Sequence, residues 1–238
     1  MNRQVPAAYA IIGKGRVATH FCHYFDLLGL RYQQWHRQQP FSRLTEILTH
    51  ASHVLVLISD SQIDPFIEQQ LAGKHTVVHF SGAHISDAAF TAHPLQTFPL
   101  TLYTLEQYQQ IPFIIEIEGL PFADLLPGVP NPHYAIKRSQ KPLYHALCVM
   151  ANNFTTLLWQ KLITEFETTL GIEASAITPI LKQTFANLDA DPANALTGPI
   201  ARGDKTTLTN NLNALRGDSF HAIFNAFINA HEVTHDRT

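Results

Sequence analysis

The sequence predicts an α/β protein in which a doubly wound, mostly parallel sheet is followed by an all-helical segment. Short apolar runs of strand length alternate with amphipathic helical stretches through the first half of the chain. This alternation is typical of a parallel sheet covered by helices on both faces. From residue 139 onward the apolar residues recur only at helical spacing. We therefore expect one domain over residues 1–138 and an all-helical domain over residues 139–238.

Six runs in the first half match strands. They cover residues 9–12, 30–37, 53–58, 76–80, 113–117 and 133–136. The runs 53–58, 76–80 and 113–117 are rich in β-branched residues and leucine. The connections between the first four runs are long enough to contain crossover helices. A proline-rich stretch over residues 120–132 separates the last two runs.

The second half carries four helical patterns, over residues 143–170, 174–188, 205–215 and 220–233. The first ends at Gly171, a residue type that often terminates helices. The last has a broad apolar face, formed by Phe220, Ile223, Phe224, Phe227 and Ile228. We expect this face to form a homodimer. The alternative is that the helix folds back and covers it within one chain.

The composition indicates a globular protein without a charged binding surface. The 238 residues are 45% hydrophobic and 15% charged, with a net charge of −3, so neither nucleic acid nor a membrane is an expected partner. No segment approaches the roughly 20 apolar residues of a membrane span, and the run 9–12 reads as a first strand rather than a signal peptide. Cys22 and Cys148 lie in apolar helical patterns and read as small buried hydrophobes, which favours the reducing cytoplasm.

The motif Gly13-Lys14-Gly15-Arg16-Val17-Ala18 lies between the first predicted strand and a helix. In this context Gly13 permits a tight turn, Gly15 lets a pyrophosphate approach the backbone, and Ala18 lets the helix pack on the strand. The start of the helix supplies free amide donors. The motif therefore predicts a Rossmann-type dinucleotide site, and the alternative is a glycine turn that binds nothing.

The second predicted strand indicates which dinucleotide binds. A carboxylate is expected about twenty residues past the glycine motif when the ribose 2′-hydroxyl is bound. Here residues 30–37 contain no acidic residue, and Arg37 follows His36 at the end of the run. A guanidinium can chelate a 2′-phosphate, so Arg37, helped by His36, predicts NADP(H). The alternative is an arginine solvated in a polar loop.

Three predicted loops follow strands and would border the cofactor, because ligands bind at the carboxyl ends of strands in open α/β sheets. They are Ser59-Asp60-Ser61, Ser81-Gly82-Ala83 and the segment 93–99. We assign the first two, through Ser59, Asp60, Ser61, Ser81 and Gly82, to the cofactor. We assign His93 and Gln96 to the substrate. Taken singly, each loop could be an ordinary turn.

Candidate catalytic residues lie on the long predicted helix. His145 and Asn153 are eight residues apart and share a face. A histidine can donate a proton to the oxygen formed when hydride reaches a carbonyl, and an asparagine amide can hold that oxygen. The alternative is that His145 is a structural helix residue.

Polar residues between the later helices are candidates for binding the substrate. Thr197, Arg202 and Asp204 lie close together around Gly198-Pro199 and Gly203, which are expected to break helices, and Asn187 lies on the preceding helix. Arg202 is the natural candidate for a substrate carboxylate. Asp204 could instead cap the helix that starts at Lys205.

A zinc-type motif occurs at His231-Glu232-Val233-Thr234-His235. Such a site needs a third ligand further along the chain and a deep cleft. The remaining residues 236–238 offer no convincing ligand set, and a chance match is unsurprising among 14 histidines. We expect no metal.

Several motifs together resemble the Rossmann-like DUF2520 family. They are Ser81-Gly82, the segment 93–98, Tyr144-His145 and the segment 196–204. The family is similar in architecture to pyrroline-5-carboxylate reductases, β-hydroxyacid dehydrogenases and ketopantoate reductases, in the superfamily of F420-dependent NADP oxidoreductases. The resemblance implies a helical domain like the C-terminal domain of 6-phosphogluconate dehydrogenase. Some members resemble alternative ketopantoate reductases of the PanG type.

The resemblance implies an NADPH-dependent reductase of a small 2-oxo acid, with ketopantoate, the precursor of pantoate in coenzyme A synthesis, as substrate. One departure bears on the chemistry. β-Hydroxyacid dehydrogenases place a lysine four residues before the helix asparagine, where this chain has Val149, and Lys141 and Lys182 are the nearest lysines. Two alternatives therefore stay open: an NADP-binding sensor without catalysis, and an imine reductase.

Overall fold

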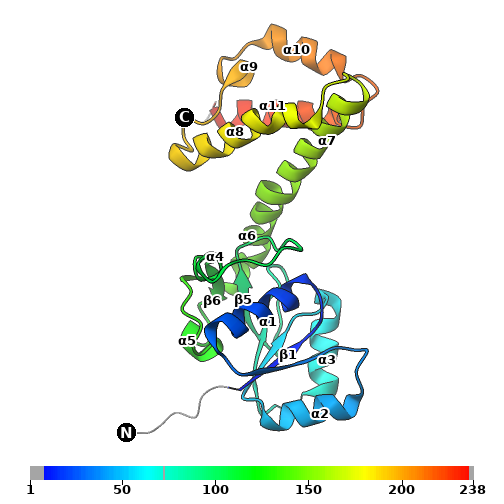
Figure 1. The fold of residues 1–238 in the computed structure, drawn as a ribbon. Coiled ribbons are helices and arrows are strands. Elements are labelled where there is room, and N and C mark those ends of the chain that lie inside the picture. Colours follow the sequence, from blue (N-terminus) through cyan, green and yellow to red (C-terminus); the bar gives the residue numbers. More distant parts are fainter. Residues whose placement is uncertain (1–7, 72, 236–238) are drawn as a thin grey trace. The chain divides into compact units, whose positions relative to one another are not determined.

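The computed structural model describes residues 8–71 and 73–235, with helical side chains described as far as residue 232. The chain divides into two compact units between Thr155 and Thr156 (Figure 1). This division lies at the start of a helix, some way after the boundary expected at residue 138. Each unit is described by itself below.

The first unit is built on a seven-stranded sheet with the order β2-β1-β3-β4-β5-β6-β7. Neighbouring strands are parallel except for β5 and β6, which are antiparallel. This confirms the predicted α/β class with a mostly parallel sheet. The strands are β1 (Tyr9–Ile12), β2 (Tyr32–Trp35), β3 (His53–Val56), β4 (Thr76–His79), β5 (Phe90–Pro94), β6 (Phe113–Glu116) and β7 (His133–Ile136).

Alternate residues of β1 face two different hydrophobic cores. Tyr9 and Ile11 belong to a core that contains α1 (Arg16–Leu28), α4 (Leu105–Gln109) and α5 (Phe122–Leu125). Ala10 and Ile12 belong to a core on the other face, covered by α2 (Phe41–His50) and α3 (Ile63–Gln70) (Figure 1). Phe21 and Phe25 of α1 are buried in the first of these cores.

The long helix predicted over residues 143–170 forms as three consecutive segments. A short 3₁₀ turn, η2 (Arg138–Gln140), leads into α6 (Lys141–Cys148). A π-helical segment, η3 (Val149–Phe154), follows and continues into α7 (Thr155–Thr168). A π-helical segment has a wider turn than an α-helix, so residues before and after it are not related by the spacing of a regular α-helix.

Strand β5 was not predicted from the sequence. Its residues Thr91 and His93 are polar, yet β5 pairs with strands on both sides. The Thr91 hydroxyl bonds to both neighbouring strands, and Nδ1 of His93 bonds to Tyr144 on α6. As a result His93 lies in a strand rather than in the loop that we expected.

The second unit is helical. After the 3₁₀ turn η4 (Ala174–Ile177) come α8 (Thr178–Ala190), α9 (Gly198–Ala201), α10 (Lys205–Ala214) and α11 (His221–His235). The described residues of this unit contain no strand. The short helix α9 forms where Gly198 and Pro199 were expected to break helices, because proline is well accommodated in the first turn of a helix.

Two further expectations concern the surface and the cysteines. No helix in the described ranges is long and apolar enough to cross a membrane. Cys22 and Cys148 are free, as expected, but each is only partly buried. Cys22 packs against the core that contains α1.

The two motif glycines should differ in their effect on stability. In Gly13→Ala a Cβ atom would lie 2.2 Å from the Leu57 carbonyl oxygen, at φ +134°, so we expect a loss of at least about 1–3 kcal/mol in the free energy of unfolding. Gly15→Ala is the matched control, since its φ is −72° and no atom lies within 4 Å. It should lose less than about 1 kcal/mol. Urea denaturation measures the free energy of unfolding of both variants. Equal losses in the two variants would contradict the conclusion that position 13 requires glycine and position 15 does not.

Candidate active site

The glycine turn between β1 and α1 is held by contacts with β2 and with Leu57, which follows β3. The backbone N–H of Gly13 donates to the carbonyl oxygen of Trp35 on β2 at 2.8 Å. Its own carbonyl oxygen accepts from Nε2 of Gln34 at 2.8 Å. Because the Leu57 carbonyl occupies the place of a Cβ atom, only glycine fits at position 13.

The start of α1 is open to a ligand. Gly15 is the N-cap residue, no side chain caps the helix, and no acidic residue lies in the first turn. Nothing lies within 4 Å of the point where a Cβ atom of Gly15 would be. The first amides of a 13-residue helix therefore face free space, and the helix dipole favours an anion there.

A cavity of about 960 Å³ surrounds this turn. It lies at the carboxyl ends of β1, β2 and β3, and its lining continues to Phe80 and Ser81 after β4. This position is where ligands bind in open α/β sheets, and the volume is that of a large ligand pocket. Of the predicted cofactor residues, the cavity lining includes Gly13, Lys14, Gly15, Arg16, Val17, His36, Arg37, Ser59, Asp60 and Ser81.

Three predicted cofactor residues do not line this cavity. Ala18 is fully buried in the core below the turn, which fits its expected packing role. Ser61 lies in the short 3₁₀ turn η1 (Asp60–Gln62) between two lining residues. Gly82 is buried next to Ser81, where it contacts two histidines described below.

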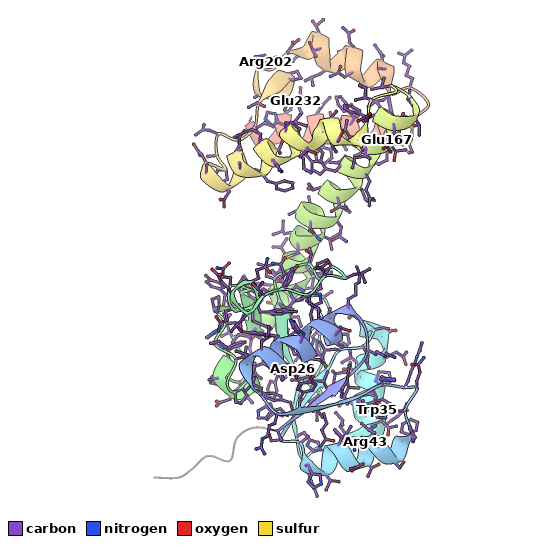
Figure 2. The ribbon with its side chains drawn as sticks, in the orientation of Figure 1. Asp26, Trp35, Arg43, Glu167, Arg202 and Glu232 are labelled. Atoms are coloured by element: carbon purple, nitrogen blue, oxygen red, sulfur yellow. The ribbon has the colours of Figure 1, made fainter. Side chains whose placement is uncertain are left out.

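Trp35 directly precedes His36 and Arg37, the two residues expected to bind the 2′-phosphate. Its Nε1 donates to the Pro40 carbonyl oxygen at 3.1 Å, which holds β2 against the start of α2 (Figure 2). His36 and Arg37 follow on the cavity wall. Within the described part of the chain, Arg37 is exposed and forms no ion pair, and the buried Nδ1 of His36 has no hydrogen-bond partner.

At the far end of the cavity lining, Ser81 leads to a cluster of aromatic side chains. Its Oγ donates to Asp60 Oδ2 at 2.6 Å. The neighbouring Gly82 packs against His93 and His145, whose ring centroids are 6.2 Å apart. His93 Nδ1 lies 2.6 Å from the Tyr144 hydroxyl. The structure thus brings together His93, His145 and the Ser81-Gly82 turn, which the sequence suggested separately.

Lys141 anchors the helix that carries these groups. Its side chain is 2% exposed, and its Nζ donates to the His84 carbonyl oxygen, to Thr91 Oγ1 at 2.6 Å and to Glu116 Oε1 at 3.0 Å. An ammonium group has three donors, so these three acceptors saturate it. Burial lowers the pKa of Lys141, and the contact with Glu116 opposes that shift. Lys141 is therefore a buried anchor and not a free proton donor.

The network of Lys141 continues to the cavity. Thr91 Oγ1 donates to Glu116 Oε1 at 2.9 Å and lies 2.9 Å from His79 Nε2. The backbone N–H of Ser81 donates to His79 Nδ1 at 3.3 Å. Burial, and then the charge of Lys141, lowers the pKa of His79 to about 3. His79 is therefore neutral, with its Nε2–H donating to Thr91.

Two predicted residues of the first unit lie apart from this cluster. Asn153 is exposed in the π-helical segment, where its Oδ1 accepts from Asn152 Nδ2 at 3.4 Å. Gln96 is exposed after β5, and its Oε1 accepts from the backbone N–H of Thr97 at 2.8 Å. Their expected contacts with the substrate stay predictions.

The remaining predicted residues belong to the second unit. Asn187 accepts from Gln183 Nε2 at 2.6 Å, and Thr197 precedes α9 without capping it. Asp204 caps α10, because its Oδ1 accepts from the Thr207 N–H at 3.0 Å, as the alternative for this residue anticipated. Arg202 is exposed at the end of α9 (Figure 2). Their assignment to the substrate stays a prediction.

The zinc-type motif brings no ligand set together in the described part of the chain. There, no group of three His, Cys, Asp or Glu side chains is arranged to hold a metal ion. The side chain of His235 lies outside the described residues.

Comparisons with known proteins agree with this fold and with the sequence motifs. Residues 121–230 match the family described as a domain of unknown function, DUF2520. The match runs from the residue before α5 to α11, so the matched region includes α6 with Lys141, Tyr144 and His145. Among curated proteins there is no significant sequence match.

Solved structures share the whole fold. A Bacteroides fragilis protein described as a candidate NADP oxidoreductase is 20% identical, with a TM-score of 0.75 over 95% of this chain and 98% of that one. Protein TM1727 from Thermotoga maritima is 20% identical, with a TM-score of 0.70 over 97% and 100% of the two chains. An Aspergillus terreus reductive aminase, solved with NADPH and ethyl levulinate, is 14% identical, with a TM-score of 0.63 over 98% and 95%.

The sequence did not predict the network of buried polar side chains that anchors α6. Lys141, Glu116, Thr91 and His79 come from four separate elements, and none belongs to a recognisable motif. Thr91 could not be identified as a buried residue, because the strand that contains it, β5, was not predicted. Lys141 was considered only for its spacing to Asn153, and not for the partners that the sheet provides.

The neutral state of His79 predicts an acid-sensitive fold. An unfolded histidine has a pKa of about 6.5, whereas that of folded His79 is about 3. Below pH 6.5 the unfolded chain therefore binds more protons, so stability falls as the pH falls. The stability advantage of wild type over His79→Gln should shrink from pH 7 to pH 5, by at most about 1.4 kcal/mol per pH unit.

Urea denaturation at several pH values measures this effect. His50→Gln is the control, because it also removes one histidine but His50 is exposed at the end of α2. A constant or growing advantage of wild type over His79→Gln at acid pH would contradict the neutral assignment.

Proposed function

We propose that the protein is an NADPH-dependent reductase. The observation that carries the proposal is the cavity that combines the open start of α1 with Arg37 on its wall and Ser81 at its far end. The amides of α1 would hold the pyrophosphate, and Arg37 with His36 would bind the 2′-phosphate. A structural relative solved with NADPH supports this cofactor. When bound, the cofactor would supply a hydride.

The reaction end of the site is proposed at the Ser81-Gly82 turn. His93 and His145 both contact Gly82 there, next to a residue that lines the cavity. A protein group near the substrate oxygen must stabilise its developing charge and provide a route for a proton. His145 is the proposed acid, and Asn153 is proposed to hold the same oxygen in the assembled site.

We propose a small 2-oxo acid as the substrate, with ketopantoate as the first compound to test. The support is the resemblance of the DUF2520 motifs to ketopantoate reductases. Asn187, Thr197, Arg202 and Asp204 in the second unit, with His93 and Gln96 in the first, are the proposed substrate residues. Arg202, exposed and free of ion pairs among the described residues, would bind the carboxylate.

An imine reductase is the second candidate. A structural relative is named a reductive aminase, and Lys141 is saturated by its buried partners, so no lysine of the α6 cluster is free to act as an acid. Imine reduction makes a smaller demand for a proton-donating acid, because a protonated imine already carries its proton.

We further propose that the protein is a cytoplasmic homodimer. Two free cysteines are compatible with a reducing compartment. Apolar side chains are exposed on α8 and α11, including Phe185, Ile223 and Phe227, and a second copy would cover them. Sedimentation velocity distinguishes this dimer from a monomer.

Loss of Arg37 should change cofactor preference. A hydrogen bond to a charged group contributes about 1.5–3 kcal/mol, so Arg37→Ala should weaken NADPH binding roughly 10- to 150-fold and leave NADH binding nearly unchanged. Fluorescence titration measures both affinities. Arg43→Ala is the matched control, because Arg43 pairs with Glu46 and Gln33 and does not line the cavity. Equal binding of NADPH and NADH to wild type would refute the assignment.

NADPH oxidation against a panel of 2-oxo acids and cyclic imines tests the reaction itself. Ketopantoate should be reduced, and Arg202→Leu should raise KM more than it lowers kcat, because a carboxylate anchor binds substrate and transition state alike. Arg216→Leu, also exposed in the second unit, should behave like wild type. Unchanged kinetics of Arg202→Leu with a lower melting temperature would assign Arg202 a structural role instead.

A further inference from the structure

His93 has one ring nitrogen that is held and one that is not. Nδ1 lies 2.6 Å from the Tyr144 hydroxyl. Nε2 faces Gly82, since a Cβ atom added to Gly82 would lie 3.0 Å from it. Among the described residues, Nε2 has no hydrogen-bond partner. His93 is half-buried, so an unpartnered ring nitrogen next to Ser81, which lines the cavity, is available to a ligand that extends beyond Ser81.

The contact with Tyr144 determines which nitrogen carries the proton. Ring N–H groups donate to oxygen at about 2.7–3.2 Å, whereas hydroxyl groups donate at about 2.5–3.0 Å. The short contact of 2.6 Å allows the phenol to donate to Nδ1, and this is the arrangement that the inference takes and that the experiment below tests. A neutral imidazole has one donor and one acceptor, so in this arrangement Nε2 carries the hydrogen.

The surroundings keep both partners uncharged. Burial, followed by the charges of His145 and Lys141, lowers the pKa of His93 to about 4, and Asp60 opposes that shift only weakly. The neutral His79 lies in the same network. Burial raises the pKa of Tyr144, so the phenol keeps its proton. At neutral pH the pair is therefore a neutral phenol and a neutral imidazole.

We propose that His93 donates a hydrogen bond from Nε2 to the reacting oxygen of the substrate, and that Tyr144 is the positioning residue that fixes this tautomer. The inference rests on the proposed reductase function. Hydride addition to a carbonyl carbon forms a C–H bond, breaks the π bond and leaves an electron pair on oxygen. The Nε2–H group of His93 stabilises this charge, and a proton from His145 or water then completes the alcohol.

The network around Lys141 sets the positions of both His93 and Tyr144. Tyr144 and His145 follow Lys141 by three and four residues, so all three lie on one face of α6. The buried Lys141 ties this face to Thr91 and Glu116. Thr91 is two residues from His93 in β5, so the same interaction sets the position of both members of the pair.

Nuclear magnetic resonance of protein labelled with ¹⁵N-histidine tests the tautomer without turnover. Wild-type His93, assigned through His93→Gln, should carry its proton on Nε2 and stay neutral from pH 5 to 8. Tyr144→Phe should populate the Nδ1–H tautomer and raise the pKa of His93, because the donor to Nδ1 is lost. Tyr134→Phe is the control, since Tyr134 is 63% exposed on β7, and it should change neither. A proton on Nδ1 in wild type, or no change in Tyr144→Phe, would overturn the assignment.

Kinetics test the contact with substrate. His93→Leu should lower kcat about 10²- to 10³-fold while NADPH affinity stays within a factor of two or so of wild type. His93→Gln should retain more activity, because its amide can still donate. Full activity of His93→Leu would exclude the proposed role.

A separate measurement distinguishes this proposal from the proposed function. If wild type reduces no compound in the panel, the reductase assignment fails. In that case the His93 resonances are followed while oxamate, an unreactive 2-oxo acid analogue, is added with NADP⁺. A shift of Nε2–H supports the oxygen contact, and its absence at saturating oxamate refutes it.

Discussion

The buried ammonium group of Lys141 is the interaction on which the candidate active site depends. An unpaired charge in an interior costs several kcal/mol, and here a carbonyl oxygen, a hydroxyl and a carboxylate satisfy all three donors. These acceptors come from the loop after β4, from β5 and from β6. Because the network must be complete to be tolerated, it fixes the first turn of α6 against the sheet. Tyr144 and His145 are then positioned one turn later.

The two ends of the candidate site offer different interactions to a ligand. At the start of α1 the protein offers free amides and open space, which suit a charged phosphate. Next to Gly82 it offers half-buried rings, of which His93 and Tyr144 are uncharged at neutral pH, and these suit an oxygen whose charge develops only during a reaction. Ser81 belongs to both ends, since it lines the cavity and its backbone N–H is bound to His79. One short turn after β4 therefore links cofactor binding to the proposed chemistry.

Much of the fold could be predicted because its signals are local. The strands β1, β3, β4 and β6 are short, largely apolar runs, and the glycine motif identified the turn into α1. Strand β5 could not be predicted, because Thr91 and His93 make it look like a loop until neighbouring strands supply their partners. Helix α9 and the π-helical segment were missed for a related reason: Gly198-Pro199 suggested a break, and helical periodicity does not reveal a change in hydrogen bonding between successive turns.

The sequence by itself determined the features that depend on neighbouring residues. These are the tight turn at Gly13, the uncapped start of α1 and the absence of acidic residues from the segment 30–37 that ends in Arg37. Only the tertiary structure decided which polar groups are buried and what they contact. His93 and Tyr144 are 51 residues apart, and Lys141 lies 25, 50 and 57 residues from Glu116, Thr91 and His84. Their meeting depends on the strand order of the sheet. Burial and distant charges then set the protonation of the histidines, and neither quantity can be read from sequence spacing.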